Sequence, residues 1–391
     1  MSDTLTEAPP QTPTRPARPW VKIIATAVLL VVLLLLPVLV GSQVAYLKLA
    51  QYILIGAVGG IGLTLLVGQA GQLSLASPFF LLLGAVSYAV LAGDPADTPD
   101  LVALHWPPAL AVIGAVVICG LVGLAFAPVS GRLRGIYLGV ASLSLVFLGL
   151  WLGQSLGILT GGTSSGRPPP TFYLFGFPFS NTTPAPTIAG VPIQKQQRLW
   201  YLFLAFAVLA YALAQGAVRS RIGRAWRAVR DNEAAAAAMG VSVARVKAGA
   251  FTISSAYAGL AGVMTALWLD LVKPDENEFT GNYSLTVAIA FLAIVIIGGL
   301  GSVPGAVVGA IVVSVTPLSV LIPPAPVAPA PVSAVLPHAA STSASAPAAI
   351  ALLRPRIIVA PFGIAKRRDD GRSQPHHRAR TARRAPRRGR R

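Results

Sequence analysis

Cysteine, histidine and charged residues are all scarce in this chain of 391 residues. The single cysteine, Cys119, lies in an apolar run, where a thiol usually behaves as a small buried hydrophobe. One cysteine excludes both a disulfide framework and a cysteine-based metal cluster. Of the four histidines only His105 lies outside the C-terminal part of the chain. A polytopic membrane enzyme, which needs His, Asp or Glu clustered at a membrane face, is therefore the disfavoured alternative, and we predict no catalytic residue and no metal site.

Charged residues make up 11% of the chain and hydrophobic residues 54%, whereas soluble domains carry about 25% charged residues. Several uncharged apolar stretches reach the roughly 20 residues that a helix needs to cross a bilayer. The sequence therefore predicts an all-α polytopic membrane protein, a bundle of about nine transmembrane helices within a range of eight to ten. The predicted spans are about 21–40, 47–67, 78–93, 107–129, 136–157, 199–218, 248–269, 284–300 and 303–322. The third is short enough to be a broken or re-entrant element.

The net charge of +18 is concentrated at one end of the chain. From Arg354 onward there are 14 Lys/Arg against two Asp, a net +12, so the preceding 353 residues carry only +6. Much of that remainder lies in three short loops, before the first span, between the fourth and fifth spans, and at 219–247. This is the positive-inside pattern rather than a nucleic-acid-binding face. We expect residues 1–20 and loop 219–247 to be cytoplasmic and residues 21–316 to form the transmembrane domain.

No ionisable residue falls at the centre of any predicted span. Ion-coupled transporters usually keep such a group near the midplane, so the energy for any transport must come from elsewhere. The chain also lacks a G-x-x-x-x-G-K-[ST] sequence, so it cannot bind ATP through a P-loop.

Neutral polar side chains mark a candidate path for a solute. Four of them lie in a glycine-broken stretch, and irregular backbone at membrane depth is tolerated only where it is buried or lines a watery path. The alternative for each serine is a hydrogen bond to its own helix backbone. The candidates are Gln69, Gln72, Ser74, Ser77, Ser142 and Ser144.

The loop from Ser220 to Phe251 predicts a short isolated helix. Asp231 is a good N-cap, Asn232 and Glu233 suit the first turn, and Ala234 begins a run of five alanines. Gly240 then supplies a stop, which leaves a helix of about eight residues. Such a helix is marginal in water by itself, so it needs a partner surface. A plain cytoplasmic connector is the alternative.

Glu233-Ala234-Ala235 followed by Gly240 resembles the EAA loop of ABC-importer permeases, the helix that docks on the cytoplasmic ATPase. The flanking SRIGRAWRAVRDNE and ARVKAGAF resemble the permeases of the branched-chain amino-acid transport family. The resemblance implies that Asp231, Asn232, Glu233, Ala234, Ala235 and Gly240 are docking residues.

Three further segments resemble that family, in the family's order. GQAGQLSLASPFF at 68–80 resembles its G-x-A-G-Q-x-S-L-G-H-A-x-F stretch, with departures at Ala76, Ser77 and Pro78. RLRGIYLGVASLSLVF with the following LTGGTSSG resembles its LRGIYFAxxTLAF and L-T-G-G-x-x-G segments. IIGGLGSVPGAVVGAIV resembles its glycine-rich hinge, which implies hinge or packing roles for Gly298, Gly299, Gly301, Gly305 and Gly309.

The resemblance, which covers about residues 20–316, implies a subunit of a bacterial inner-membrane importer for branched-chain or similar amino acids. It implies two cytoplasmic ATPase subunits, which bind the ATP, a second related permease and an extracytoplasmic solute-binding protein. Surrounding lipid is a partner as well, whereas no cofactor and no nucleic acid is expected. A urea or short-amide importer is the alternative within transport, because specificity lies largely in the binding protein.

Residues 317–391 do not continue this pattern. Six prolines fall between Pro323 and Pro337, which no continuous helix accommodates, and an Arg/Pro/Gly-rich tail follows. We expect either a reading-frame change in the gene or a genuine low-complexity tail. Translation of the other two frames downstream of Thr316 distinguishes the two, because only a frame change yields a further apolar span.

Overall fold

The computed structural model describes residues 31–40, 43–96, 99–133, 135–174, 177–179, 187–188, 191–192, 194–274 and 282–321. The chain divides into two compact units, and the second, Pro329–Arg391, lies wholly outside the described residues. The predicted cytoplasmic segment 1–20 and nearly all of the predicted tail also lie outside them. The account that follows concerns the described part of the first unit.

Nine apolar helices occur in the described residues, one for each predicted span. Five are long enough to cross a membrane alone, and four are shorter. The long ones are α2 (Val44–Leu63) with η1 (Thr64–Gln69), α4 (Pro108–Arg132), α5 (Ile136–Ser155), α8 (Lys195–Arg219) and α11 (Val243–Leu269). The shorter ones are Val31–Val40, α3 (Ser77–Ala92), α12 (Leu285–Ile297) and Val303–Val315 within α13 (Val303–Leu321). The predicted all-helical polytopic fold is confirmed, and the first span is described only from Val31.

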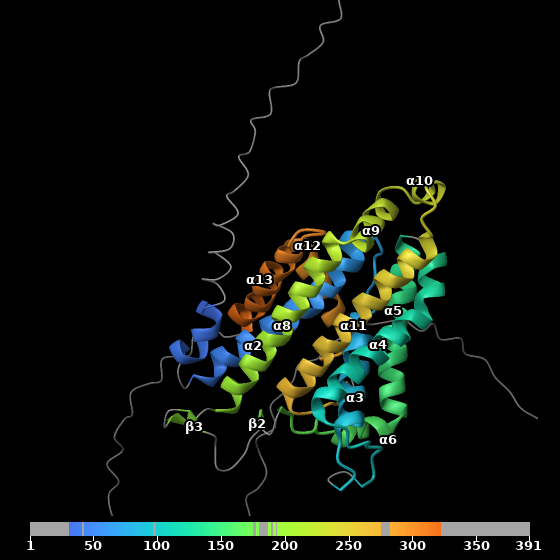
Figure 1. The fold of residues 1–391 in the computed structure, drawn as a ribbon. Helices are drawn as coiled ribbons and strands as arrows, with labels where there is room; N and C mark the ends of the chain where they lie inside the picture. Colours follow the sequence, from blue (N-terminus) through green and yellow to red (C-terminus); the bar gives the residue numbers. More distant parts are fainter. Residues whose placement is uncertain are drawn as a thin grey trace, which may run out of the picture. The chain divides into compact units, whose positions relative to one another are not determined.

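The connecting elements lie at the two ends of the bundle (Figure 1). One end carries α9 (Arg221–Asp231) and α10 (Glu233–Ala238), and we call it the α9–α10 end. The opposite end, the α6 end, carries α6 (Gly157–Thr160) and α7 (Gly162–Ser165). It also carries two short antiparallel hairpins, β1 (Tyr173–Leu174) with β2 (Phe177–Pro178) and β3 (Thr187–Ile188) with β4 (Val191–Pro192).

Helix α11 is central and packs most extensively on α4, α3 and α2. Small residues let the backbones touch, since a Cβ on Gly84 would lie 2.2 Å from the Gly259 carbonyl oxygen. A Cβ on Gly262 would likewise lie 2.1 Å from the Leu81 carbonyl oxygen. In lipid, where no hydrophobic force pushes helices together, close backbone approach of this kind supplies the packing attraction.

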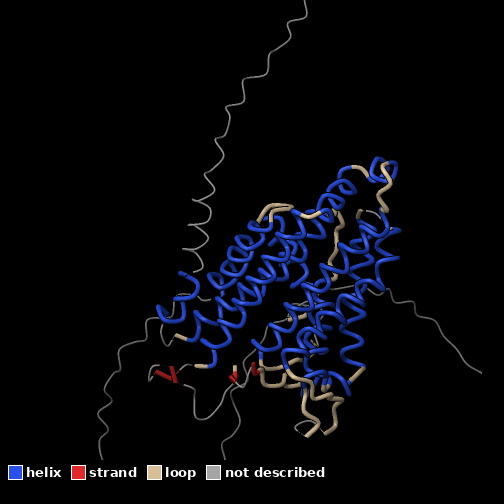
Figure 2. Tube along the Cα trace, in the orientation of Figure 1, coloured by secondary structure: helices blue, strands red, loops and turns tan. Residues whose placement is uncertain are grey.

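The second span departs from regular α-helix. Its last six residues, Thr64–Gln69, form a π-helix, and residues 70–76 that follow are not helical. Alternate residues along this segment are buried, which is the pattern of extended chain, namely Ala70, Gln72, Ser74 and Ala76. Figure 2 shows the segment in tan, running from the α9–α10 end in among the helices. We call residues 70–76 the extended segment.

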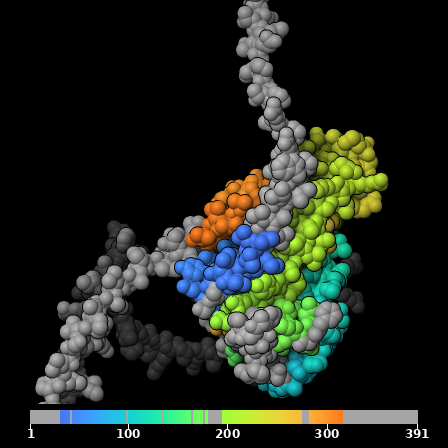
Figure 3. Space-filling model, turned by 60° about the vertical axis from the view of Figure 1, so that its left-hand side comes forward, coloured from blue at the N-terminus to red at the C-terminus, as the bar shows by residue number. Residues whose placement is uncertain are grey.

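The first helix packs on α8. The indole nitrogen of Trp200 donates to the Leu33 carbonyl at 2.9 Å, and the Gln197 amide donates to the Pro37 carbonyl at 3.5 Å. Figure 3 shows this face, on which blue Val31–Val40 and α2, green α8 and orange α13 are visible together. The helix that contains Val31–Val40 is therefore part of the bundle and not a separate appendage.

Candidate functional site

Helix α9 is amphipathic and lies across the α9–α10 end. Gly223, Trp226 and Val229 recur at three-residue spacing and are buried, whereas Arg224 and Arg227 are exposed. Glycine is needed at 223 because a Cβ there would lie 2.3 Å from the carbonyl oxygen of Val218. The side chain of Ser220 caps the helix by accepting from the Ile222 amide at 3.2 Å. The buried stripe fixes α9 to the bundle and leaves Arg224 and Arg227 in solvent.

Helix α10 is shorter than expected and begins one residue later. Asn232, not Asp231, is its N-cap, because the Asn232 side-chain oxygen accepts from the Ala235 amide at 3.0 Å. Asp231 is instead the last residue of α9, so its predicted capping role is wrong. The helix has six residues rather than about eight. Gly240 follows with φ +83°, as its predicted role as a stop requires.

The surface of α10 is small and uncovered. Among its alanines only Ala236 is buried, while Ala234, Ala235, Ala237 and Ala238 are exposed. Met239, which follows them, is 73% exposed. A short helix with a smooth, exposed, uncharged surface is suited to enter a groove on another protein.

Glu233 connects α10 to the start of α11. Its carboxylate lies 2.7 Å from the ammonium of Lys247, whose side chain is only 5% exposed. The backbone carbonyl of Lys247 accepts from the Gln72 side-chain amide at 3.1 Å. The predicted docking residue Glu233 and the predicted path residue Gln72 are thus linked through one lysine that the sequence analysis had not singled out.

A second connection runs through Arg230, which donates to the carbonyl of Gly68 at the end of η1. The side-chain amide of neighbouring Gln69 donates to the Gly301 carbonyl at 2.6 Å. Gly68 and Gly301 are in backbone contact, since a Cβ on Gly68 would lie 2.2 Å from the Gly301 nitrogen. Gln69 therefore lies against the turn between α12 and α13 and does not line the bundle interior.

The five predicted hinge glycines divide into two kinds. Gly299 and Gly301 have φ of +92° and +87°, which a tight turn requires and other residues rarely adopt. Gly298, Gly305 and Gly309 pack α12 against α13, because a Cβ on Gly298 would lie 2.2 Å from the Gly305 carbonyl oxygen. The family's hinge motif is, in this state, a tightly packed helix pair.

A narrow pocket with room for about one water molecule lies where the extended segment meets α3, and hydroxyl groups line it. Ser74 and Ser77 contribute from this segment and α3, and Ser254 and Ser255 contribute from α11. Phe80 and Phe251 are among the apolar residues of its wall. Sequence reasoning missed the two α11 serines, for which the available signal was a pair of hydroxyls inside a predicted span.

The remaining predicted path serines lie apart from each other. Ser142 is buried, donates to the Gly139 carbonyl at 2.8 Å and accepts from the Leu75 amide at 2.8 Å. Ser144 is exposed on another face of α5 and donates to the Ala141 carbonyl at 2.7 Å. The structure brings Ser142 to the extended segment, and it does not bring Ser144 there.

Arg167 organises the α6 end and was missed by sequence reasoning. It is 1% exposed, and its guanidinium donates to the carbonyls of Val102 at 2.8 Å and Leu159 at 3.2 Å. Its backbone pairs with that of Val272 through bonds of 2.8 and 2.7 Å. Burial lowers the pKa of this guanidinium from its usual value. One residue thus joins three loops, and its only sequence signal is a lone arginine after the LTGGTSSG segment.

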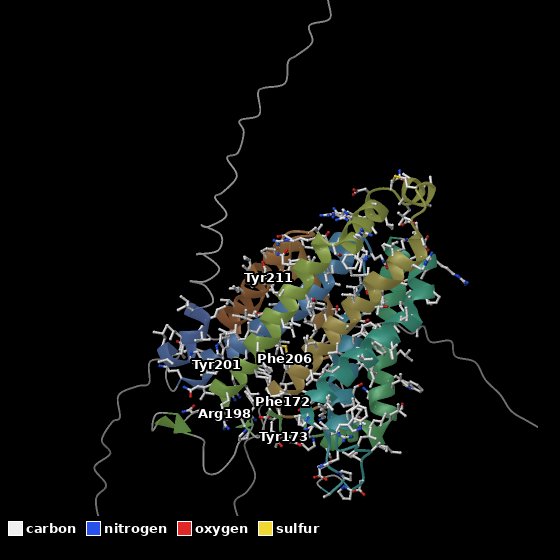
Figure 4. All side chains as sticks on the ribbon, in the orientation of Figure 1. Phe172, Tyr173, Arg198, Tyr201, Phe206 and Tyr211 are labelled. Carbon is white, nitrogen blue, oxygen red and sulfur yellow. The ribbon has the colours of Figure 1, made fainter. Side chains whose placement is uncertain are left out.

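Aromatic residues hold the next stretch of this loop on α8 (Figure 4). Phe172 contacts Phe206 of α8 with ring centroids 6.4 Å apart, and it contacts Phe179 at 5.6 Å. Arg198 of α8 donates to the Pro178 carbonyl at 2.6 Å. These contacts hold the described part of this loop against α8.

No cluster of His, Cys, Asp or Glu suited to hold a metal ion occurs within the ranges that the structure describes. Comparison with protein families matches residues 44–322 to the family described as "Branched-chain amino acid transport system / permease component". No solved structure matches the chain.

Three relatives illustrate the similarity. The permease protein LivM of the high-affinity branched-chain amino acid transport system of Salmonella typhimurium is 32% identical over 268 residues. This alignment covers 66% of the present chain and 59% of LivM, so the chain spans less than two thirds of that relative. LivH of the same organism is 27% identical over 264 residues, 65% of this chain and 78% of LivH.

The autoinducer 2 import system permease protein LsrC of Klebsiella pneumoniae is 37% identical over 109 residues, 27% of this chain and 31% of LsrC. The family match covers every described helix from α2 to α13. The chain is a multi-pass membrane protein that belongs to the family of permease components of branched-chain amino acid transport systems.

Proposed function

We propose that this chain is the membrane-spanning subunit of an ATP-driven importer for branched-chain or similar small neutral amino acids. The observation that carries the proposal is α10, a six-residue helix whose alanine surface is exposed while its base is held by the Glu233–Lys247 pair. Apart from the buried Ala236, this helix has no packing role within the described bundle. A groove on an ATPase subunit gives it one.

The α9–α10 end faces the cytoplasm of a bacterium in this proposal, with the chain in the inner membrane. The exposed arginines of α9 and Arg132 at the end of α4 lie at this end, which supports the orientation. The N-terminal end of helix Val31–Val40 then also faces the cytoplasm. The α6 end, ordered by Arg167, meets the solute-binding protein outside.

The complete importer contains two ATPase subunits, a second related permease and the solute-binding protein. The ATPase subunits bind ATP and hydrolyse it, and this chain converts their movement into access for the solute. The docking residues are Asn232, Glu233 and the exposed alanines. Gly240 ends this helix and lets the chain turn toward α11. Asp231 contributes as the end of α9.

The side chains around the pocket are uncharged, which favours a small neutral solute over an ionic one. Ser74, Ser77 and Ser254 offer hydroxyl groups, and Phe80 and Phe251 offer apolar walls. Hydroxyls can bond the ammonium and carboxylate of a zwitterion without a fixed charge that would hold it too tightly to leave. The relatives LivM and LivH are named as permease proteins of branched-chain amino acid transport systems, which agrees with this class of solute.

The test is co-purification and uptake with the ATPase, second permease and binding protein encoded beside this gene. Leucine uptake into proteoliposomes should require ATP, whereas urea should neither enter nor compete. The variants Ala235→Arg and Ala238→Trp should abolish ATPase co-purification, because both side chains are exposed and the fold does not need them small. Arg132→Ala, also exposed at this end, is the control and should behave as wild type. Normal co-purification and uptake in both α10 variants would overturn the docking role.

A further inference from the structure

The extended segment touches two parts of the molecule that serve different steps of transport. Its start lies beside the loop 219–247 that carries α9 and α10, which we call the docking loop. A Cβ on Gly71 would be 3.0 Å from the Arg230 side chain of this loop. Its end lines the pocket through Ser74 and Ala76, and Ser77 follows as the first residue of α3. Seven residues of non-helical chain therefore span the distance between docking loop and pocket.

Two separate side-chain links fasten the docking loop to the start of this segment. Arg230, one residue from the end of α9, donates to Gly68. Glu233, the first residue of α10, pairs with Lys247, whose carbonyl holds the Gln72 amide. One link starts from α9 and the other from α10. If the docking loop rotated as a body, it would therefore pull on both Gly68 and Gln72.

Two buried acceptors near the start of the segment could bond another donor if the segment moved. The side-chain oxygens of Gln69 and Gln72 are buried and find no hydrogen-bond partner within the described residues. Native structures satisfy most buried polar atoms with a protein group, an ordered water or an ion, so these two oxygens have capacity for a further partner. Gln69 follows Gly68, which accepts from Arg230, and Gln72 itself donates to Lys247. Both oxygens therefore lie where the docking loop is attached to the segment.

The helix that feeds the segment is also irregular. Thr64–Gln69 is wound as a π-helix, a form that occurs mostly in short pieces and often at functional sites. On its other side, the segment is held to α5 by the Leu75 amide bond to Ser142. The segment thus has an irregular hinge before it, a helix start after it, and few bonds along its length.

We propose that residues 68–76 are the gate of the solute path at the α9–α10 end, and that Arg230 and Lys247 are positioning residues through which the docking loop moves it. The inference rests on the proposed transport function. In the state described here Ser74 and Ala76 of the segment line the pocket, and movement of α9 and α10 on the ATPase draws Gly68 and Gln72 with it. The solute path then opens between the segment and α11.

The first experiment separates coupling from assembly with Arg230→Ala in the complete importer. ATPase subunits should co-purify normally and hydrolyse ATP, while leucine uptake falls about tenfold or more, as expected when a charge-assisted hydrogen bond is lost. The external binding-protein concentration for half-maximal uptake should not change, so the loss lies in turnover. Arg230→Lys keeps a donor and should recover part of the uptake. Arg132→Ala is the matched control. Coupled uptake at the wild-type rate in Arg230→Ala would overturn the proposal.

The second experiment follows the gate itself. Cys119 is the only cysteine and is buried, so Cys119→Ala gives a background for single thiols. The half-buried Leu73 is replaced by cysteine, and its labelling rate is measured with and without ATP and vanadate. The rate should change with nucleotide, and Arg230→Ala should remove that change.

Each further result of these two experiments has a defined meaning. If the labelling rate of Leu73→Cys is the same with and without nucleotide in an active importer, residues 68–76 are not the gate. If the rate still changes with nucleotide in Arg230→Ala, Arg230 does not couple the docking loop to the gate. Failure of the proposed function looks different, because the unaltered chain would then neither co-purify with the ATPase nor support ATP-dependent uptake. Rates are compared only in preparations in which the unaltered chain transports.

Discussion

The ammonium of Lys247 lies 2.7 Å from the carboxylate of Glu233, although a turn of chain that contains Gly240 separates the two residues. The lysine is nearly buried, whereas the glutamate is 31% exposed. The pair therefore connects a helix exposed at the end of the bundle to the first turns of its central helix. Four predictions follow from this and related contacts.

Reversal of the two charges of the Glu233–Lys247 pair tests whether their attraction matters, independently of which position carries which residue. Glu233→Lys and Lys247→Glu should each lose about 1.5–3 kcal/mol of stability, because a charged group keeps its burial and loses its partner. The double variant restores opposite charges and should regain stability and part of the uptake. Thermal unfolding in detergent and leucine uptake measure the two effects. A double variant no better than the single variants would contradict the pairing.

Substitution of Gly240 should disturb docking more than folding. A Cβ at this position would have nothing within 4 Å, so the only obstacle is the φ of +83°. Gly240→Val should cost about 1–3 kcal/mol locally and displace α10, which lowers ATPase co-purification. Gly240→Asn, which tolerates the left-handed conformation, is the control and should retain docking. Equal co-purification by the two variants would argue against a docking role for α10.

The contact of α3 with α11 should tolerate no side chain at Gly84. Gly84→Leu forces the helices apart at the Gly259 carbonyl and should destabilise the bundle by about 3 kcal/mol or more. Gly216→Ala in α8 meets nothing within 4 Å and should leave stability unchanged or slightly raised. Loss of the folded peak in size-exclusion chromatography reports the difference. A Gly84→Leu chain as stable as Gly216→Ala would be inconsistent with the described packing.

The energy source should be ATP and not the proton gradient, because no charged residue lies at the centre of any predicted span. In cells that rely on this importer, a protonophore should leave leucine uptake unchanged while ATP is maintained. Arsenate, which depletes ATP, should stop it. Uptake that collapses with the proton gradient at constant ATP would contradict the proposed energy source.

Sequence predicted the membrane helices well because span length and apolarity are local properties of the chain. The nine apolar helices in the described residues match the predicted ranges, the first of them from Val31 onward, and the docking loop lies between the sixth and seventh of them. The sequence also located the stop at Gly240, since few residues other than glycine adopt its conformation. Features that depend on residues close together in the sequence could therefore be predicted from it.

Sequence did less well where distant segments meet. Asp231 and Asn232 are both good caps by residue type, but α9, which buries Val229 in its last turn, continues through Asp231 and leaves Asn232 as the cap. Ser144 and Ser142 are equivalent in the sequence, yet the rotation of α5 buries one and exposes the other. Ser254, Ser255, Arg167 and Lys247 owe their positions to contacts with residues far along the chain, which no local pattern records.

The π-helix at Thr64–Gln69 has a geometric consequence for everything after it. A π-turn takes up more residues per turn than an α-turn, so a return to α winding changes the screw phase of the chain that follows. Each residue of shift corresponds to a rotation of about 100° and a rise of about 1.5 Å. With α winding throughout, Gln69 would meet Gly301 at a different angle from the one at which it now donates to the Gly301 carbonyl. The π winding therefore sets the direction in which the second span presents its last side chain to the turn between α12 and α13.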